Sequence, residues 1–251
     1  MDLLRLQVPP EVRESRVETI GTMVLLASRD MRSANFEAIH DDDLAYMVEL
    51  YDERFFDRWL LATVREKTGS PLGLRLSSMM TSAGGKTIHY RGRRFVGNHS
   101  RLEIAVATHL LLMTFRDVER ETFVGGIRCE NRLQALQRVV EHEIIHLAEI
   151  LAWGKSSCSA SRFKGLAKNI FGHTKTRHQL VTPREHAAIA HNIHVRQRVT
   201  FDFKGVRHTG VVNRIHHRAT VLVPSAKGTP YSDGKKYIKY LIPLHHLRPV
   251  E

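Results

Sequence analysis

The sequence predicts an α+β fold, in which a mixed domain of helices and a small sheet precedes a small all-β barrel. One observation is a long helical pattern at residues 131–153, which follows strand-like stretches between residues 72 and 107. The other is a change from Val199 onward to short stretches in which apolar and polar residues alternate. Spacings of three and four are typical of helices, and alternation is typical of strands. With 251 residues, the chain is long enough for one large or two modest domains.

The first domain is expected to contain helices around a short sheet. Residues 1–34 show little pattern and are interpreted as an N-terminal extension. A helix is predicted from Asp43, its N-cap, to about Thr68, because its apolar residues recur at spacings of three and four. Strands follow at 72–80 and 86–95, with 82–85 as the turn between them, and 102–107 is predicted as a strand that leads into a helix.

The pattern at residues 131–153 is the clearest helix, and Gly154 is a plausible C-cap. A polar loop at 155–161 leads to a second helix at about 162–171. We assign residues 35–182 to this domain and interpret 183–198 as a linker with some helix at 185–191. Short strands then follow at 199–203, 210–212, 219–223 and 237–242, separated by glycines and a proline, which suggests a small barrel over 199–251.

Composition narrows the classes of function. The chain is 42% hydrophobic and 25% charged, as in ordinary folded proteins. Its two cysteines, Cys129 and Cys158, form no Cys-x-x-Cys pair, so a reducing compartment is expected. Met1 to Pro10 lacks the apolar core of a targeting segment, and the apolar runs are too short to cross a bilayer. We therefore expect a cytoplasmic protein without a membrane partner.

A His-Glu-x-x-His pattern lies in the long helix. His142 and His146 are four residues apart, so on a helix they share one face and can bind one metal ion. Glu143 lies between them and can take a proton from a water that zinc has acidified to a pKa of ~7. The apolar stripe centred on Val140 and Ile144 faces the other way, which presents the histidines to a cleft. The alternative is an amphipathic helix with two surface histidines.

Two segments together resemble the SprT-like zinc metalloprotease family. They are Arg132 to Glu149 and the MTSAGGKT stretch at residues 80–87, which is similar to the family's strand turn before the metal helix. Phe163-Lys164-Gly165-Leu166-Ala167 is similar to its helix after the metal loop. The resemblance covers about residues 45–173 and implies a minimal zincin fold with Zn²⁺ as cofactor. It also implies a substrate class, namely proteins crosslinked to DNA.

The chain departs from the family at the third metal ligand. The family pattern His-Gly-x-x-Phe is replaced by Ser159-Ala160-Ser161-Arg162-Phe163, and serine is a poor zinc ligand. We expect His173 to be the third ligand, because an antiparallel helix of ten residues returns the chain by ~15 Å toward His142. Cys158, which is adjacent to Ser159, and His178 remain as alternatives.

The C-terminal residues 199–250 resemble, in pattern only, the small SH3-like barrels of ribosomal and transcription-associated modules. The chain carries a formal charge of +12, and residues 183–251 contribute +8 of it, with 12 Lys/Arg against 4 Asp/Glu. Basic and aromatic residues are interleaved there, which is typical of nucleic-acid binding. They are Arg214, His216, His217, Arg218, Tyr231, Lys235, Lys236, Tyr237, Lys239 and Tyr240.

Two functions are compatible with these patterns. The first is a zinc metallopeptidase of the His-Glu-x-x-His type that acts on protein substrates and is recruited to nucleic acid by its basic module. The second is a non-catalytic, metal-stabilised protein that binds nucleic acid or protein on a zincin scaffold. The missing family histidine favours the second function, and the intact Glu143 favours the first, because a purely structural site needs no base.

Overall fold

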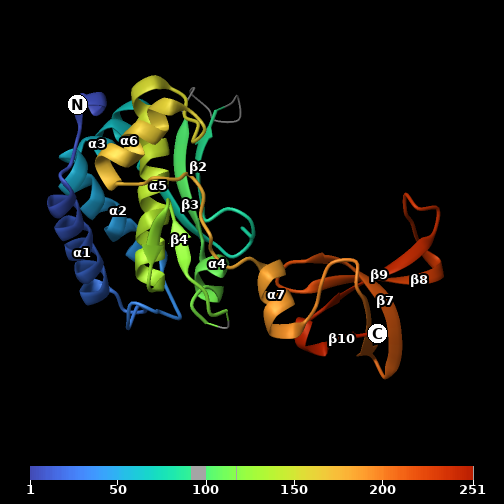
Figure 1. Ribbon diagram of the computed structural model, residues 1–251. Helices are drawn as coiled ribbons and strands as arrows, with labels where there is room; N and C mark the ends of the chain where they lie inside the picture. Colours follow the sequence, from blue (N-terminus) through green and yellow to red (C-terminus); the bar gives the residue numbers. More distant parts are fainter. Residues whose placement is uncertain (92–99, 117, 251) are drawn as a thin grey trace. The chain divides into compact units, whose positions relative to one another are not determined.

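The computed structural model describes residues 1–91, 100–116 and 118–250, and it divides the chain into two compact units (Figure 1). The N-terminal unit comprises Met1–Phe115 and Glu119–Leu180, and the C-terminal unit comprises Arg116–Val118 and Val181–Glu251. Helices and short sheets occur together, so the predicted α+β class is confirmed. No helix in the described part of the chain is both long and apolar enough to cross a membrane.

The first 34 residues are part of the core, which corrects their interpretation as an extension. A 3-10 turn, η1 (Leu3–Arg5), precedes helix α1 (Pro10–Ala27), which packs against α2 and α5. Val17, Ile20 and Val24 of α1 are buried in the main hydrophobic cluster. The buried face of α1 is narrow and includes Gly21, so the apolar residues of this helix form only a weak helical pattern in the sequence.

The predicted helix from Asp43 to Thr68 is two helices, α2 (Asp41–Phe56) and α3 (Trp59–Thr68). The break falls at Asp57 and Arg58, which both have positive φ angles, of 49° and 61°. The side chain of buried Asp52 accepts hydrogen bonds from the first backbone N–H groups of α3 and so caps it. His40 is the N-cap of α2, whereas the predicted cap, Asp43, lies at its third position and completes a capping box.

A three-stranded sheet lies beside the helices. Its order is β1-β3-β2, with β1 parallel and β2 antiparallel to β3. The strands are β1 (Gly73–Ser77), β2 (Gly85–Tyr90) and β3 (Arg101–Ala107), and α4 (Thr108–Met113) follows as predicted. The end of the strand predicted at 86–95 lies outside the described residues. Within the described chain, β2 pairs with β3 alone and forms one edge of the sheet.

The long helix α5 (Arg132–Trp153) is central to the N-terminal unit and contacts α1, α2, α3, α4 and α6 as well as β2 and β3 (Figure 1). The Asn131 side chain caps its start, and Gly154, with φ 71°, ends it. A short hairpin of β4 (Thr122–Val124) and β5 (Ile127–Cys129) precedes α5 and was not predicted. Helix α6 (Ser161–Phe171) follows a short loop.

The C-terminal unit is a five-stranded antiparallel sheet of order β10-β6-β7-β8-β9 with its own hydrophobic cluster. Helix α7 (Pro183–His191) packs against this unit, and Ala187 and Ile193 belong to its cluster, so residues 183–198 are not a simple linker. The other elements are β6 (Arg198–Phe203), β7 (Val206–Ile215), β8 (Ala219–Pro230), β9 (Lys236–Ile242), η2 (Leu244–His246) and β10 (Arg248–Pro249).

Candidate metal centre

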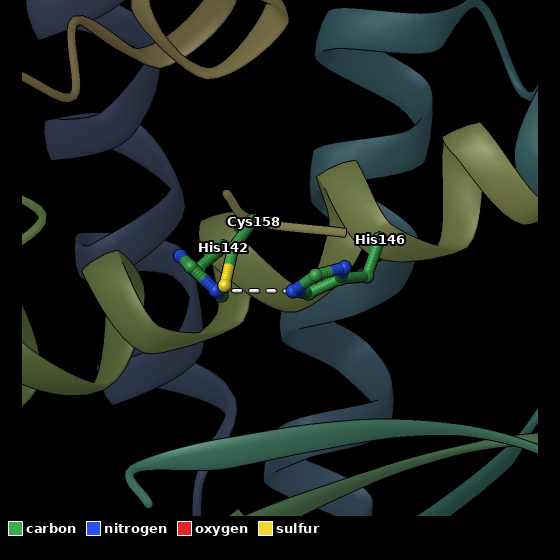
Figure 2. Close-up of side chains that lie close together, drawn as sticks. All are labelled: His142, His146 and Cys158. Atoms are coloured by element: carbon green, nitrogen blue, oxygen red, sulfur yellow. Dashed lines mark hydrogen bonds between the residues drawn. The ribbon is translucent and has the colours of Figure 1, made fainter. Parts of the chain in front are cut away.

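Helix α5 brings His142 and His146 together, as the spacing predicted. Their Nε2 atoms lie 3.2 Å apart, and the rings are tilted toward each other (Figure 2). Two nitrogens that bind one tetrahedral metal at ~2.0–2.1 Å are separated by about 3.3 Å. The two lone pairs are therefore spaced as a shared ion requires. Phe163 of α6 packs against both rings, with centroid distances of 4.9 and 4.4 Å, and fixes their orientation.

Cys158 is the third potential ligand. Its sulfur and the two imidazoles offer ligand atoms that all lie within 4.8 Å of one another (Figure 2). Gly154 turns the chain at the end of α5, and the loop that follows returns the thiol to the histidines. Within the described residues, no other set of three or more His, Cys, Asp or Glu side chains meets this criterion. The cluster can hold a metal ion.

His173, our expected third ligand, lies elsewhere. It is 3% exposed, and its Nε2 is 2.8 Å from the Glu141 carboxylate, on the turn of α5 beside His142. Tyr51 and Arg138 donate to the same carboxylate, so His173 belongs to a buried polar cluster that joins α2, α5 and the segment after α6. The helix α6 does return the chain toward α5, but Cys158 is already in the position that His173 was expected to take.

His178 is close enough to His142 to lower its pKa, but its ring is not among the ligand atoms that lie within 4.8 Å of one another. Its Nδ1 accepts a hydrogen bond from the backbone N–H of Leu180, and its backbone forms a bridge with Val124. Burial lowers the pKa of its imidazole, whereas a hydrogen bond with the Ser82 backbone raises it. Ser159, at the position where the resemblance leads us to expect a histidine, is exposed and hydrogen-bonds only to Ser157 within the described residues.

A chain of hydrogen bonds on the Nδ1 side of the ring, away from the ligand cluster, orients His146. Its Nδ1 lies 2.7 Å from Ser156 Oγ, which donates to the buried Glu149 carboxylate at 2.5 Å. Because Ser156 uses its proton on Glu149, it accepts from Nδ1–H, and the Nε2 lone pair of His146 is left to face the cluster. Arg162 donates to the other Glu149 oxygen at 2.6 Å and stacks on Trp153 at 4.2 Å.

The pKa values of His142 and His146 are both lowered, which keeps their imidazoles neutral. Burial, followed by the nearby His146, His173 and His178, lowers the pKa of His142 to about 3. Burial also lowers the pKa of His146, although the Glu149 carboxylate partly opposes this. A neutral imidazole is the form that binds a metal. At neutral pH, neither side chain needs to lose a proton before it can act as a ligand.

Glu143 lies against the edge strand β2 and is only 4% exposed. The hydroxyl of Thr87 is 2.8 Å from its Oε2, and the Thr87 backbone also hydrogen-bonds to the carboxylate. Gly85 permits this approach, since a Cβ there would lie 2.7 Å from Cγ of Glu143. Burial raises the pKa of Glu143 to about 7, against the lowering effect of the Thr87 hydrogen bonds. A group with this pKa can accept and return a proton near neutrality.

Comparison of this chain with models of protein families, with characterised proteins and with solved structures found no significant match. The chemistry of the site is therefore the basis for assigning a function. Sequence reasoning found His142, Glu143 and His146 and kept Cys158 as an alternative. It did not identify the supporting roles of Thr87, Glu149, Ser156 and Arg162, whose contacts depend on the fold and not on a spacing within the motif.

The basic and aromatic residues of the C-terminal unit fall into two groups. Tyr231 and Tyr237 pack edge to face at 5.3 Å, and the ammonium of Lys239 lies 5.5 Å from the Tyr231 ring. Tyr240 points to the other face of β9, where it packs against Phe201, Phe203 and His208. The interleaved residues therefore do not form one surface, and each group pairs a ring with a cation, because the ammonium of Lys204 lies 5.8 Å from the Phe203 ring.

Proposed function

We propose that this chain is a zinc-dependent metallopeptidase. The observation that carries the proposal is the position of Glu143, a buried carboxylate with a raised pKa, beside a cluster of three potential ligands, two of which lie on the same helix. A site that only stabilises the fold has no need of a base there. Two neutral imidazoles and a thiolate are ligands that zinc prefers, and three protein ligands leave a position open for chemistry.

When bound, zinc would supply Lewis acidity, which lowers the pKa of a coordinated water to ~7 and polarises a carbonyl. Glu143 would accept the proton of the attacking water and return it to the leaving amine. Thr87 would hold this carboxylate in place through its hydroxyl, 2.8 Å away. The Ser156–Glu149 pair would keep the Nδ1 proton on His146 and so direct Nε2 to the metal.

The edge strand β2 supports a peptide as the substrate. An extended peptide can add to an unpaired sheet edge through main-chain hydrogen bonds. Within the described residues, β2 has such an edge, and Thr87 in the middle of this strand contacts the base. A peptide that adds to β2 would therefore run past Glu143 with its carbonyls near the ligand cluster.

The test is zinc content and peptide cleavage by the full chain. Glu143→Gln should retain one zinc per chain and lose hydrolysis, whereas His142→Ala and His146→Ala should lose both. Glu130→Gln, an exposed change just before α5, is the matched control and should keep wild-type activity. A wild-type protein that binds zinc but cleaves no unfolded protein substrate would favour the alternative, a non-catalytic binding protein stabilised by a metal.

We also propose that the C-terminal unit recruits the enzyme to nucleic acid. Residues 183–251 carry a net charge of +8, and Lys239 lies over the ring of Tyr231, which packs on Tyr237. Cations neutralise phosphates, and exposed rings stack on bases without preference for sequence. Proteins bound to nucleic acid would then be the substrates closest to the active site.

A further inference from the structure

A cavity in the N-terminal unit is lined by eight residues, four of which are cationic. It has a volume of about 480 Å³ and lies between α6 and the segment that follows it. Lys164 and Lys168 line one side from consecutive turns of α6, and Lys175 and Arg177 line the other. All four side chains belong to exposed residues, and no carboxylate is part of the lining.

The four cations are not neutralised by the protein. Within the described residues, no ion pair with a carboxylate involves any of them. Like charges around one hollow repel each other unless an anion occupies it. His173 also lines the cavity, and its Nδ1 is buried without a hydrogen-bond partner. The unpaired cations indicate a ligand that carries negative charge, whereas Nδ1 of a neutral His173 that donates from Nε2 to Glu141 can only accept a hydrogen bond.

We propose that this cavity binds the phosphodiester backbone of a nucleic acid, without preference for base sequence. Several cations spread along two sides of a hollow suit a chain of phosphates better than a single phosphate group. Apart from His173, no aromatic ring lines the cavity, so it lacks the stacking platforms that bind bases. The excess charge of +12 on the whole chain would attract the same polyanion. The inference does not depend on the metal site, and it adds a contact outside the C-terminal unit.

The experiment measures binding of a fluorescent single-stranded DNA oligonucleotide to the full chain over a series of salt concentrations. Lys164→Glu/Lys168→Glu and Lys175→Glu/Arg177→Glu each alter one side of the cavity. Arg29→Glu/Arg32→Glu changes the charge equally at exposed positions after the end of α1 and is the matched control. Each phosphate contact contributes about 0.7 to the slope of log affinity against log salt, so each cavity pair should reduce this slope by about 1.4. Unchanged zinc content and circular dichroism would show that the variants are folded.

The expected result is weaker binding and a shallower salt slope for both cavity pairs, with a slope near wild type for the control. Equal losses in all three variants would show a general effect of net charge and overturn the proposal. Wild-type binding by both cavity pairs would also overturn it. Competition by a multiply phosphorylated peptide that exceeds competition by unlabelled DNA would assign the cavity to phosphorylated proteins instead.

Discussion

The hydroxyl of Thr87 in strand β2 lies 2.8 Å from the carboxylate of Glu143 in helix α5, which links the sheet to the base of the proposed reaction. Thr87→Val keeps the shape of this side chain but removes the donor. A hydrogen bond to a charged group is worth ~1.5–3 kcal/mol, so we expect kcat/KM to fall about 10- to 100-fold. Thr87→Ser keeps the hydroxyl and should remain close to wild type. Equal activity of the valine and serine variants would show that Thr87 does not hold the base.

The raised pKa of Glu143 predicts how the stability of the zinc-free protein depends on pH. With a pKa of about 7 when folded and 4.5 as its ordinary value, the folded state keeps a proton that the unfolded state has lost. Stability should therefore fall as pH rises from about 4.5 to 7 and then level off. Glu143→Gln removes this loss, so the variant should be more stable than wild type by ~3 kcal/mol at pH 8 and similar at pH 4. Chemical denaturation in the presence of a chelator measures the difference.

The hydrogen-bond chain behind His146 predicts a loss of metal affinity. Ser156→Ala removes the acceptor for Nδ1–H and leaves one oxygen of the buried Glu149 without its donor. Loss of such a supporting contact typically weakens metal binding 10- to 100-fold. Ser157→Ala is a close control, because this exposed serine of the same loop bonds to Ser159 instead. Competition with a zinc chelator measures both affinities, and equal values would exclude a role for Ser156.

Helix α5 and its pair of histidines could be predicted from sequence because the pattern that defines them is local. Spacing on a helix alone brings His142 and His146 together, and an asparagine and a glycine mark its ends. The third ligand is a different problem, because it depends on how the loop at 155–160 turns. The sequence argument preferred a return over a full helix to His173 and kept Cys158 as an alternative, and the turn after Gly154 is enough to bring Cys158 to the two histidines.

Two other features were not predicted from the sequence because they also depend on contacts between residues that no local pattern connects. Asp57 and Arg58 adopt left-handed conformations at the break between α2 and α3. The sequence has no glycine or proline there that would have predicted a break. What stabilises the break is Asp52, which caps α3 from the preceding helix. The buried pair of His173 and Glu141 is a contact between residues 32 positions apart, and no periodicity predicts it.

The ligand cluster predicts that the two cysteines differ in reactivity. Burial raises the pKa of Cys129 to about 11, so this thiol should resist alkylation in the folded protein. Cys158 is partly exposed and should be alkylated by iodoacetamide after zinc is removed, but protected when zinc is bound. Mass spectrometry of the two peptides separates these cases. Alkylation of Cys158 at the same rate with and without zinc would exclude it as a ligand.

Substitution tests the same assignment. Cys158→Ser should weaken zinc binding by orders of magnitude, whereas Cys129→Ala, the control, should not. His173→Ala should reduce the free energy of unfolding, because it leaves the buried Glu141 with one partner fewer, and yet retain zinc. If instead His173→Ala loses zinc while the protein stays folded and Cys158→Ser keeps it, the two histidines are completed by His173, as the sequence first suggested.

The last prediction concerns the C-terminal unit, where Lys239 lies 5.5 Å from the ring of Tyr231 and Tyr231 packs on Tyr237. Tyr231→Ala should weaken binding of single-stranded DNA by ~1–3 kcal/mol, because one stacking platform is lost, and leave the salt slope unchanged. Lys239→Glu should instead reduce the salt slope, by about 0.7 if it contacts one phosphate.

Phe203→Ala is the control for Tyr231→Ala, since Phe203 is another aromatic ring of this unit but is exposed and packs with Tyr240 on the other face of β9, whereas Tyr231 is half-buried. Its binding should stay near wild type. If Phe203→Ala weakens binding and Tyr231→Ala does not, the nucleic acid contacts the face of Tyr240, because rings on opposite faces of a strand cannot stack on the same bases. If neither ring matters but Lys239→Glu still reduces the slope, the unit binds phosphates without stacking, as the cavity beside α6 is proposed to do.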